Sequence, residues 1–423
     1  MERLIFHVDV NSAYLSWEAA RRVANGEEDI RLIPSAIGGD REKRTGVILA
    51  KSIPAKKFDI QTGEPVASAL RKCPHLFLAK PDFRLYETCS NAFIAVCTRY
   101  APVVEQTSID ECFLDMSGTS HIYPDPLALA FRIKDEIRDT LGFTVNIGIS
   151  SNKLLAKMAS DFEKPDKVHT LYPNQVKEKL WPLPVRALFS VGRVTADRLQ
   201  NACIYTIGDL ANAPLQTIQL LSGIKGGQQI HDYANGIDFD PVVSEKREAK
   251  GYSTSTTLEK DVTDAEKANV ILLALADSVS SRMRADGVKA ACVCVTIRGN
   301  DFKDKSKQKK LDAPSDITSE IFDISKKLFL QLWDKRTPLR LLGIALSNVV
   351  RDDCVQQSLF TDAVKERETK LDKTVDSIRG KFGADAISRG ALLEPGIRVG
   401  KKYKAQMDNA QPPGKNKDDP RIR

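Results

Sequence analysis

Three carboxylates in this sequence stand where a metal ion would be useful. Asp9 follows the apolar stretch Leu4–Val8 and directly precedes a segment with helical character. A carboxylate buried alone is strongly unfavourable unless it is paired or binds a metal ion. Asp110 and Glu111 are adjacent, within the stretch QTSIDECFLDM that begins at Gln106. Neighbouring carboxylates repel one another unless a cation lies between them.

Together these carboxylates could hold two hard divalent ions such as Mg²⁺, with phosphates and water as the remaining ligands. The chemistry that uses such a pair of ions is phosphoryl or nucleotidyl transfer, in which one ion activates the attacking oxygen and the other stabilises the leaving group. Adjacent residues of a regular strand point to opposite faces. We therefore expect Asp110 and Glu111 to lie at a strand end or an irregularity. The alternative is that Asp9 caps a helix and that the other two belong to a surface turn.

The composition is that of an ordinary globular protein with a mild excess of positive charge. The 423 residues are 42% apolar and 28% charged, with a net charge of +7, and this length predicts roughly two to four domains. A basic excess suits a polyanionic partner, although surface lysines alone could produce it. The eight cysteines form no CxxC pair and fit no zinc spacing, which is typical of free thiols in a reducing cytoplasm. No apolar run approaches the length of a membrane span, so we expect a soluble cytoplasmic protein.

Alternating strand and helix patterns predict a mixed α/β domain over residues 1–170. Strands are expected over Leu4–Val8, Leu32–Ile37, Val47–Ala50, Val103–Leu114 and Thr144–Ile149, and helices over Ala13–Val23, Phe83–Tyr100, Leu127–Leu141 and Lys153–Asp161. Residues 171–242 are expected to form short helices joined by Pro and Gly turns. Residues 243–350 follow the order β-α-β-β-α-β, with helices expected over Ala265–Ala285 and Ile317–Leu332. Residues 351–423 are polar with one helical, amphipathic stretch over Glu368–Phe382, and we expect most of the others to be disordered.

Three motifs, in this order, resemble those of the Y-family, or lesion-bypass, DNA polymerases. They are HVDVNSAYLSWE from His7, SIDECFLD from Ser108 and VNIGISSNKLLAKMASDFEKP from Val145. The likeness covers residues 1 to about 350 and indicates the DinB and UmuC branch in its Gram-positive form. It implies an α/β multidomain fold: a palm with fingers and a ferredoxin-like sheet over 1–170, a helical thumb with a helix-hairpin-helix over 171–242, and a βαββαβ little-finger domain over 243–350.

The resemblance implies a low-fidelity polymerase for damaged templates, which joins a dNTP to the primer 3′-hydroxyl and has no proofreading domain. It implies two Mg²⁺ ions held by Asp9, Asp110, Glu111 and the backbone carbonyl of Val10. Tyr14 takes the steric-gate position, where an aromatic ring leaves no space for a ribose 2′-hydroxyl. The nucleotide contacts that the resemblance implies are Ala13, Tyr14, Ser52, Lys56 and Lys164.

Several positions near the expected nucleotide depart from the family pattern. Lys56 stands where relatives often have Arg, and a lysine lacks the bidentate fork of an arginine. Ile53 stands where many relatives have a phosphate-bonding Tyr, a role that Ser52 could partly fill. Ala13 and Ala50 replace a common aromatic residue and a common Thr. These changes affect nucleotide fit and lesion preference and leave the metal triad intact.

Two segments resemble DNA-binding elements of the family. Ser190–Leu199 resembles a helix-hairpin-helix, in which a helix N-terminus directs N–H groups at a phosphate, although Ser190 replaces a usual glycine. Its expected DNA contacts are Gly192, Arg193 and Thr195. In the little finger, the lysine-rich segment with Arg298, Lys303, Lys305 and Lys307 suits contact with phosphates of any sequence. The alternatives are a plain helical corner and a solvated basic surface.

The tail contains Gln356–Phe360, of the form Q-x-x-L-F, which resembles the peptide that docks bacterial polymerases on the sliding clamp. Leu359 and Phe360 would be the apolar anchors and Gln356 a hydrogen-bonding group, whereas packing on the little finger is the alternative. The other partners implied are primer-template DNA and dNTPs, and we expect a monomer. Two rival readings stay open: a UmuC-like catalytic subunit that depends on accessory SOS proteins, and a catalytically weak DNA-binding relative.

Overall fold

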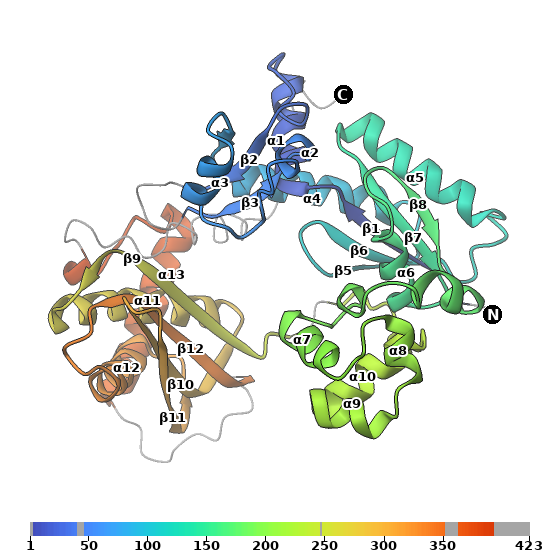
Figure 1. Ribbon diagram of the computed structural model, residues 1–423. Coiled ribbons are helices and arrows are strands. Elements are labelled where there is room, and N and C mark those ends of the chain that lie inside the picture. Colours follow the sequence, from blue (N-terminus) through green and yellow to red (C-terminus); the bar gives the residue numbers. More distant parts are fainter. Residues whose placement is uncertain (1–2, 40–45, 246–247, 352–362, 393–423) are drawn as a thin grey trace. The chain divides into compact units, whose positions relative to one another are not determined.

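The computed structural model of the chain describes residues 3–39, 46–245, 248–351 and 363–392, which form two compact units (Figure 1). The first unit contains the described residues up to 245, and the second contains those from 248 onward. Each unit has a hydrophobic core of its own. No helix within the described ranges has the length and apolarity that crossing a bilayer would require.

A five-stranded sheet forms the centre of the first unit. Its strands are β1 (Ile5–Val10), β5 (Val103–Gln106), β6 (Glu111–Asp115), β7 (Val145–Ser150) and β8 (Val168–Thr170), in the order β5-β6-β1-β7-β8. β1 pairs antiparallel with both β6 and β7. Every residue of β1 and β7 is buried, which explains why both strands have nearly continuous apolar sequences.

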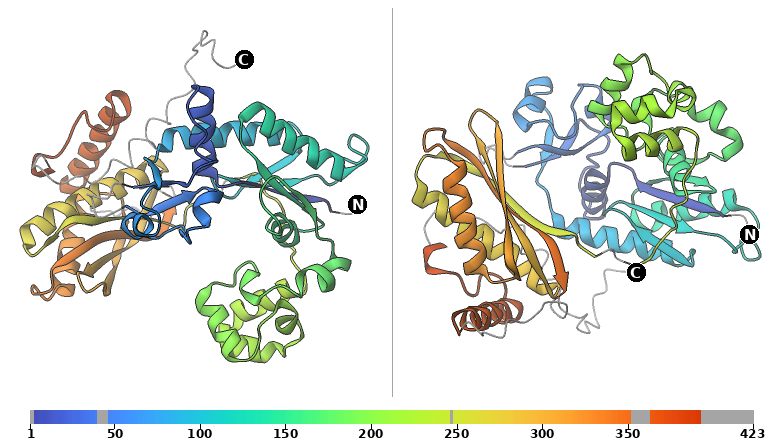
Figure 2. Two further views of the ribbon diagram at one scale, coloured as in Figure 1. Left: turned by 45° about the horizontal axis from the view of Figure 1, so that its top comes forward. Right: turned by 90° about the horizontal axis from the view of Figure 1, so that it is seen from below.

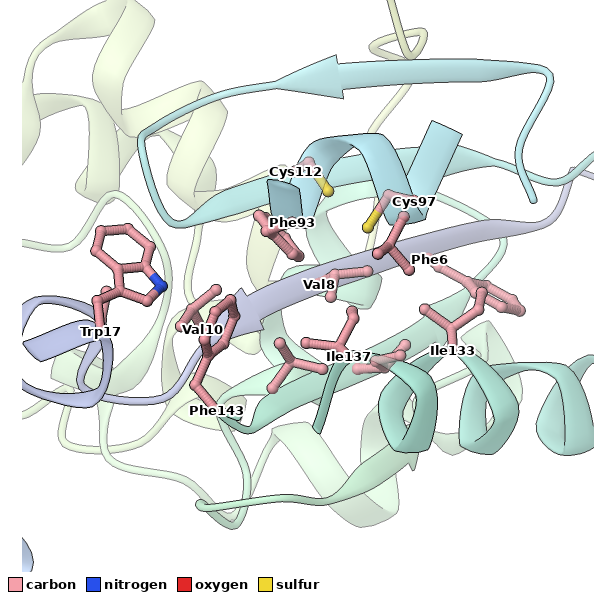
Figure 3. Packing of buried hydrophobic residues seen from close by; sticks show 14 of the residues in the cluster. Phe6, Val8, Val10, Trp17, Phe93, Cys97, Cys112, Ile133, Ile137 and Phe143 are labelled. Carbon is pink, nitrogen blue, oxygen red and sulfur yellow. The ribbon is translucent and has the colours of Figure 1, made fainter. Parts of the chain in front are cut away.

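Two long helices cover one face of this sheet. They are α4 (Phe83–Thr98) and α5 (Pro126–Leu141). Figure 3 shows the side chains of Phe6, Val8 and Val10 packed among apolar residues of these helices, and all belong to one buried cluster. Since alternate residues of a strand share a face, the intervening residues of β1 point to the opposite side.

A short helix, α6 (Lys153–Ser160), packs on that opposite side of β1 and β7. Gly148 of β7 makes the close approach possible. A Cβ at this position would overlap the carbonyl oxygen of Ala156 and lie 2.5 Å from the backbone nitrogen of Ser160. The position of α6 is therefore fixed by backbone-to-backbone packing, and this helix faces the polar residues of β1.

The smaller parts of the first unit are a three-stranded sheet and a cluster of helices. The sheet has the order β3-β2-β4, with β2 (Ser35–Gly38) paired to β3 (Ile48–Lys51) and β4 (Phe77–Ala79). Its neighbours are α1 (Ala13–Ala24), α2 (Ile53–Lys56) and α3 (Val66–Lys72). The helical cluster contains α7 (Arg193–Asn201), α8 (Ile207–Asn212), α9 (Leu215–Ser222) and α10 (Ile224–Ala234) around its own buried residues.

The second unit has a four-stranded antiparallel sheet in the order β11-β10-β12-β9. The strands are β9 (Gly251–Val262), β10 (Val288–Gly299), β11 (Asp304–Ser315) and β12 (Leu339–Arg351). α11 (Ala265–Ala285) and α12 (Thr318–Leu332) lie on one face of the sheet, as Figure 2 shows. The chain order β-α-β-β-α-β that the sequence predicts is confirmed.

Two features differ from the sequence-based expectation. The single strand expected over Val103–Leu114 is two strands, β5 and β6, which pair with each other antiparallel. The helical stretch expected in the tail is α13 (Ala363–Phe382), but its packing was not expected: Asp372 is 2% exposed and pairs with Arg284 of α11 at 3.2 Å. The described part of the tail is therefore packed on the second unit. The amphipathic stretch of the tail is this helix.

Candidate active site

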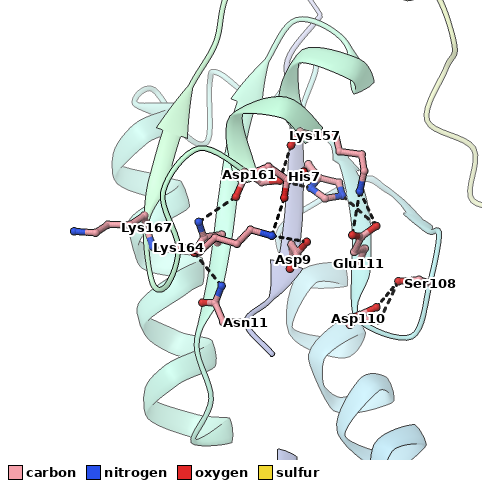
Figure 4. A network of polar contacts seen from close by, with 12 residues as sticks. His7, Asp9, Asn11, Ser108, Asp110, Glu111, Lys157, Asp161, Lys164 and Lys167 are labelled. Carbon is pink, nitrogen blue, oxygen red and sulfur yellow. Dashed lines mark hydrogen bonds and ion pairs between the residues drawn. The ribbon is translucent and has the colours of Figure 1, made fainter. Parts of the chain in front are cut away.

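Asp9 and Glu111 stand directly opposite one another in the β1–β6 pair. Opposite residues of an antiparallel pair have Cβ atoms about 5 Å apart on the same face, and like charges at such positions are destabilising. Asp9 is buried and Glu111 is half-buried. Figure 4 shows the two carboxylates side by side beneath α6. This placement requires positive charge between or beside them.

Asp110 lies in the turn that precedes β6, so the predicted strand-end position of the adjacent carboxylates is confirmed. Its side chain accepts a hydrogen bond from the Ser108 hydroxyl, at 2.6 Å. Its carbonyl oxygen accepts a hydrogen bond from the backbone N–H of Val10, at 3.0 Å. Val10 is the last residue of β1. The turn therefore brings Val10 and Asp110 beside the pair formed by Asp9 and Glu111.

Two lysines supply the positive charge in the structure. Lys164 Nζ lies 3.0 Å from Asp9 Oδ2 and 2.8 Å from Asp161 Oδ1. Lys157 Nζ, on α6, lies 3.0 and 2.9 Å from the two carboxylate oxygens of Glu111. The lysines approach different carboxylates, and no lysine contact joins Asp9 to Glu111 in the described residues. The repulsion across the strand pair is thus only partly offset.

The two facing carboxylates have opposite pKa shifts. Burial raises the pKa of Asp9 to about 7, although Lys164 acts in the other direction. The His7 ring and the Lys157 ammonium hold the pKa of Glu111 well below its usual range. Burial lowers the pKa of His7 itself, and this imidazole is fully enclosed. The site favours an ionised Glu111 and opposes the ionisation of Asp9, as expected where a further cation is needed.

The carboxylates are suitable ligands for hard divalent ions, but in the structure their oxygens are bonded to neighbouring side chains. Among the residues that the structure describes, no group of three or more His, Cys, Asp or Glu side chains is arranged to hold a metal ion. Each carboxylate is bonded to Lys164, Ser108 or Lys157 instead. Oxygen ligands from crowded carboxylates are nevertheless what Mg²⁺ prefers. A divalent ion would replace lysine contacts and relieve the repulsion between the carboxylates.

Tyr14 belongs to an aromatic group at the start of α1. Its ring centroid lies 4.7 Å from that of Tyr86 and 6.0 Å from that of Trp17. The ring is half-buried, whereas the preceding Ala13 is buried. Neighbouring rings therefore hold Tyr14 in one orientation with part of its surface exposed. Lys56, at the end of α2, is exposed.

Ser52, one of the predicted nucleotide contacts, is bonded within the protein. The side chain is buried, with 2% exposure. Its hydroxyl donates to the carbonyl of Ile33 and accepts from the N–H groups of Ser35 and Ala55. A serine hydroxyl has one donor and two acceptor positions, so all three are occupied. Ser52 caps α2, and a nucleotide could bond to its hydroxyl only in place of one of these contacts.

The predicted hairpin around Ser190 has the backbone of a tight turn. Ser190 has φ of 72°, in the left-handed region where the usual glycine would be unstrained. Gly192 then caps α7, and of the first residues of that helix Arg193 and Val194 are exposed, whereas Thr195 is half-buried. A phosphate could approach these N–H groups. The sequence departure at Ser190 has not removed the turn.

The predicted lysine row lies on β11, at the edge of the second sheet. Lys305 and Lys307 pair with Ile297 and Val295 and therefore share the face on which α11 and α12 lie. The opposite face of β11 carries Ser306, Gln308 and Lys310. Arg298 forms a two-point ion pair with Asp304, and Lys303 is exposed. These cations reach solvent along the sheet edge.

The predicted clamp contacts, Gln356, Leu359 and Phe360, lie outside the described residues.

Sequence reasoning missed His7 and Lys157, which both touch the carboxylate pair. A signal was present for each. His7 lies two residues before Asp9 and so shares its strand face. Lys157 lies four residues after Lys153 in an otherwise apolar helix, which is unusual for a residue type that is seldom buried. Neither signal shows which carboxylate the side chain would meet.

Comparisons with known proteins agree with this architecture. Residues 8–161 match the impB/mucB/samB family, residues 249–359 match its C-terminal domain, and residues 186–238 match a model described as the DNA polymerase-iota thumb domain. A DNA polymerase IV of Clostridium acetobutylicum is 43% identical over 396 residues, covering 93% of this chain and 99% of that protein. A DNA polymerase IV 1 of Bacillus subtilis is 34% identical over 395 residues, covering 93% and 94%.

A solved structure shows the same fold. A Y-family DNA polymerase chimera of Dbh and Dpo4 superposes with a TM-score of 0.70 at 21% identity, covering 82% of this chain and all of that one. The chain belongs to the Y-family of DNA polymerases, the impB/mucB/samB family. It is a DNA-directed DNA polymerase of the translesion class, and as such it acts on DNA and dNTPs with a divalent metal ion.

Proposed function

We propose that the chain extends primers across damaged template bases by two-metal nucleotidyl transfer, with low fidelity and without proofreading. The observation that carries this proposal is the facing pair of Asp9 and Glu111, with Asp110 in the adjoining turn. Two like charges at opposite positions of neighbouring strands are costly. A site that keeps them there gains from cations, and nucleotidyl transfer uses two.

Asp9, Asp110, Glu111 and the carbonyl of Val10 would hold the two Mg²⁺ ions. When bound, these ions activate the primer 3′-hydroxyl and stabilise the pyrophosphate that leaves as the oxygen joins the α-phosphorus. The sheet positions the carboxylates before substrate arrives. Lys164 pairs with Asp9 and Asp161 in the structure, so it lies beside the carboxylates with a charge suited to the triphosphate. The exposed Lys56 is the second candidate for this role.

Tyr14 would act as the steric gate against ribonucleotides, and the adjacent Ala13 would also contact the nucleotide. The rings of Tyr86 and Trp17 support this role because they limit the movement of Tyr14. A fixed ring excludes a 2′-hydroxyl better than a mobile one. We expect Tyr14→Ala to raise ribonucleotide incorporation relative to deoxynucleotide incorporation in single-turnover assays. Unchanged discrimination would remove Tyr14 from this role.

Three functional regions are proposed from the membership of the family: palm and fingers over 1–170, thumb over 171–242 and little finger over 243–350. DNA would contact the thumb through Gly192, Arg193 and Thr195, and the little finger through Lys303, Lys305, Lys307 and Arg298. Lysine contacts to phosphates release counterions on binding. Replacing the three lysines by Gln should weaken duplex binding and flatten its salt dependence. A wild-type salt slope would contradict these contacts.

Partners beyond the substrates are proposed from the tail. Gln356, Leu359 and Phe360 would dock the chain on the bacterial sliding clamp and so raise its effective concentration at a primer end. A peptide spanning residues 352–364 should bind the purified clamp, and the same peptide with Leu359→Ala and Phe360→Ala should not. Equal binding of the two peptides would remove this motif from the account. Accessory SOS proteins are a further partner class.

The direct test is primer extension by the purified chain with Mg²⁺ and dNTPs, on undamaged, abasic and bulky-adduct templates. Short, distributive extension past at least one lesion is expected, and Asp110→Asn with Glu111→Gln should abolish it. Extension that survives in this double variant would overturn the metal site. No extension by the wild type on any template, with duplex binding intact, would favour a UmuC-like subunit that needs accessory proteins, or a catalytically weak DNA-binding relative.

A further inference from the structure

Lys157 has a position that the proposed metal chemistry does not use. Its amine contacts both carboxylate oxygens of Glu111, at 3.0 and 2.9 Å, and its side chain is only 14% exposed. The ring centroid of Phe189 lies 5.4 Å from the same nitrogen. A lysine between a carboxylate and an aromatic face is favourably placed as a cation. Its amine is therefore held at Glu111 and not free to move in solvent.

The backbone that carries Lys157 is equally restricted. Gly148 sets the depth at which α6 lies on the sheet, because any side chain there would collide with the helix backbone. The Ser160 hydroxyl donates to the carbonyl of Lys157 at 2.8 Å and lies 2.7 Å from His7 Nδ1. The Ser160 hydroxyl therefore links the backbone of Lys157 to the His7 ring.

The His7 ring forms a second wall beside Glu111. His7 Nε2 lies 3.8 Å from Glu111 Oε2, and the ring also packs on Phe113 at a centroid distance of 4.6 Å. The ring is completely buried. Glu111 is thus bounded by a fixed ring and a fixed ammonium group, while Asp9 stands opposite across the strand pair.

We propose that Lys157 is a positioning residue for the polymerase reaction. It fixes the carboxylate of Glu111 on the strand face that Asp9 shares, before metal ion and nucleotide arrive. A glutamate side chain has several rotatable bonds, and restricting it in advance lowers the entropic cost of reaching the reactive arrangement. This inference rests on the metal-binding role proposed for Glu111.

A matched control for Lys157 exists on the same helix. Lys153 lies one turn earlier and pairs with Glu105 at 2.6 Å, with 11% exposure of the lysine and 12% of the carboxylate. Lys→Met at either position removes the charge, keeps much of the apolar stem and breaks a partly buried ion pair. Of these two lysines, only Lys157 touches a carboxylate of the proposed metal site. A purely structural role predicts similar effects of the two substitutions.

The experiment measures single-nucleotide incorporation, thermal unfolding and direct Mn²⁺ binding without DNA or dNTP. Lys157→Met should lower kcat by about 10–100-fold, as expected for loss of an outer partner of a metal ligand, with a nearly unchanged KM for the dNTP. Lys157→Arg should recover part of kcat, because a guanidinium also binds both oxygens of a carboxylate. Lys153→Met should lose similar stability while keeping kcat near wild type.

Mn²⁺ binding provides a reading that does not depend on turnover. An outer partner that holds a metal ligand in place strengthens metal binding, so Lys157→Met should bind Mn²⁺ several-fold more weakly than Lys153→Met. A wild-type kcat in Lys157→Met, or equal Mn²⁺ affinity in the two variants, would overturn the inference. Glu111→Gln distinguishes failure of the positioning role of Lys157 from failure of the proposed metal site. If Glu111→Gln is inactive while Lys157→Met behaves as wild type, only the positioning role fails, whereas an active Glu111→Gln would overturn the proposed metal site itself.

Discussion

The molecule contains two buried clusters of charge that are built differently. Beneath α6, the carboxylates of Asp9 and Glu111 face each other, and separate lysines contact them. Between α11 and α13, arginines and aspartates alternate, and each has at least one partner of opposite sign. The members of this second cluster are Arg284, Arg379, Arg389, Asp277, Asp372 and Asp376.

The way the charges are paired suggests a structural role for the cluster between α11 and α13 and a functional role for the cluster beneath α6. Buried charges that pair mutually need nothing more, and removing one member leaves its partners uncompensated. Asp9 and Glu111 each have a lysine partner, but no lysine among the described residues contacts both of these facing carboxylates. The α13 cluster therefore explains how the described part of the tail is held on the second unit. The α6 cluster instead indicates a site that a divalent ion would complete.

The largest effect on stability is expected from Asp372→Ala in the paired cluster. Asp372 is almost fully buried and accepts from Arg284, Arg389 and the backbone N–H of Thr318. Its removal should lower the free energy of unfolding of the second unit by about 3–5 kcal/mol, the usual cost of breaking a buried charge pair. Urea denaturation measures this loss. A loss below about 1 kcal/mol, the level of an exposed ion pair, would show that the cluster does not hold α13.

A smaller loss of stability, with a loss of activity, is expected from Gly148→Ala. The new methyl group would collide with the backbone of α6, and overpacking of this kind costs about 1–3 kcal/mol. Because α6 carries Lys157, the displaced helix should also slow nucleotide incorporation. Gly226→Ala in α10 is the control, since its methyl group would meet nothing within 4 Å. Activity that survives in Gly148→Ala would mean that the depth of α6 does not matter.

The smallest effect is expected from Lys365→Ala at the rim of the α13 cluster. Lys365 pairs with Glu320 at 3.2 Å, but the lysine is 52% exposed. Solvent screens such pairs, which contribute about 0–1 kcal/mol. Urea denaturation should therefore scarcely separate Lys365→Ala from wild type. A loss equal to that of Asp372→Ala would indicate that burial does not distinguish the core of this cluster from its rim.

Much of the fold followed from local patterns. The helix predicted over Ala265–Ala285 has those bounds as α11, because its apolar period is long and uninterrupted. The adjacent carboxylates indicated an irregularity within Val103–Leu114, but the reversal of the chain between β5 and β6 was missed, since both flanks read as strand. The docking of α13 was also missed. Its partners, such as Arg284, are distant in sequence, and its buried charges resemble those of a solvated helix.

Part of the candidate site could also be predicted from local sequence patterns. Asp9, Asp110 and Glu111 stand in short motifs, so local sequence located them. The hydrogen bonds of Ser52 to Ile33, Ser35 and Ala55 could not be predicted, because no motif records them. Lys157 reaches Glu111 only because Gly148 admits α6 to the sheet. That relation depends on packing between three elements and not on spacing along the chain.

The most direct test of the account is Mn²⁺ binding to the whole chain, followed by electron paramagnetic resonance without DNA or dNTP. We predict that the wild type binds Mn²⁺ and that Asp110→Asn with Glu111→Gln does not. We predict wild-type binding when the paired cluster loses two of its three carboxylates through Asp372→Asn with Asp376→Asn. Undiminished binding after the loss of Asp110 and Glu111, or equal loss of binding in both double variants, would contradict the distinction between the two clusters.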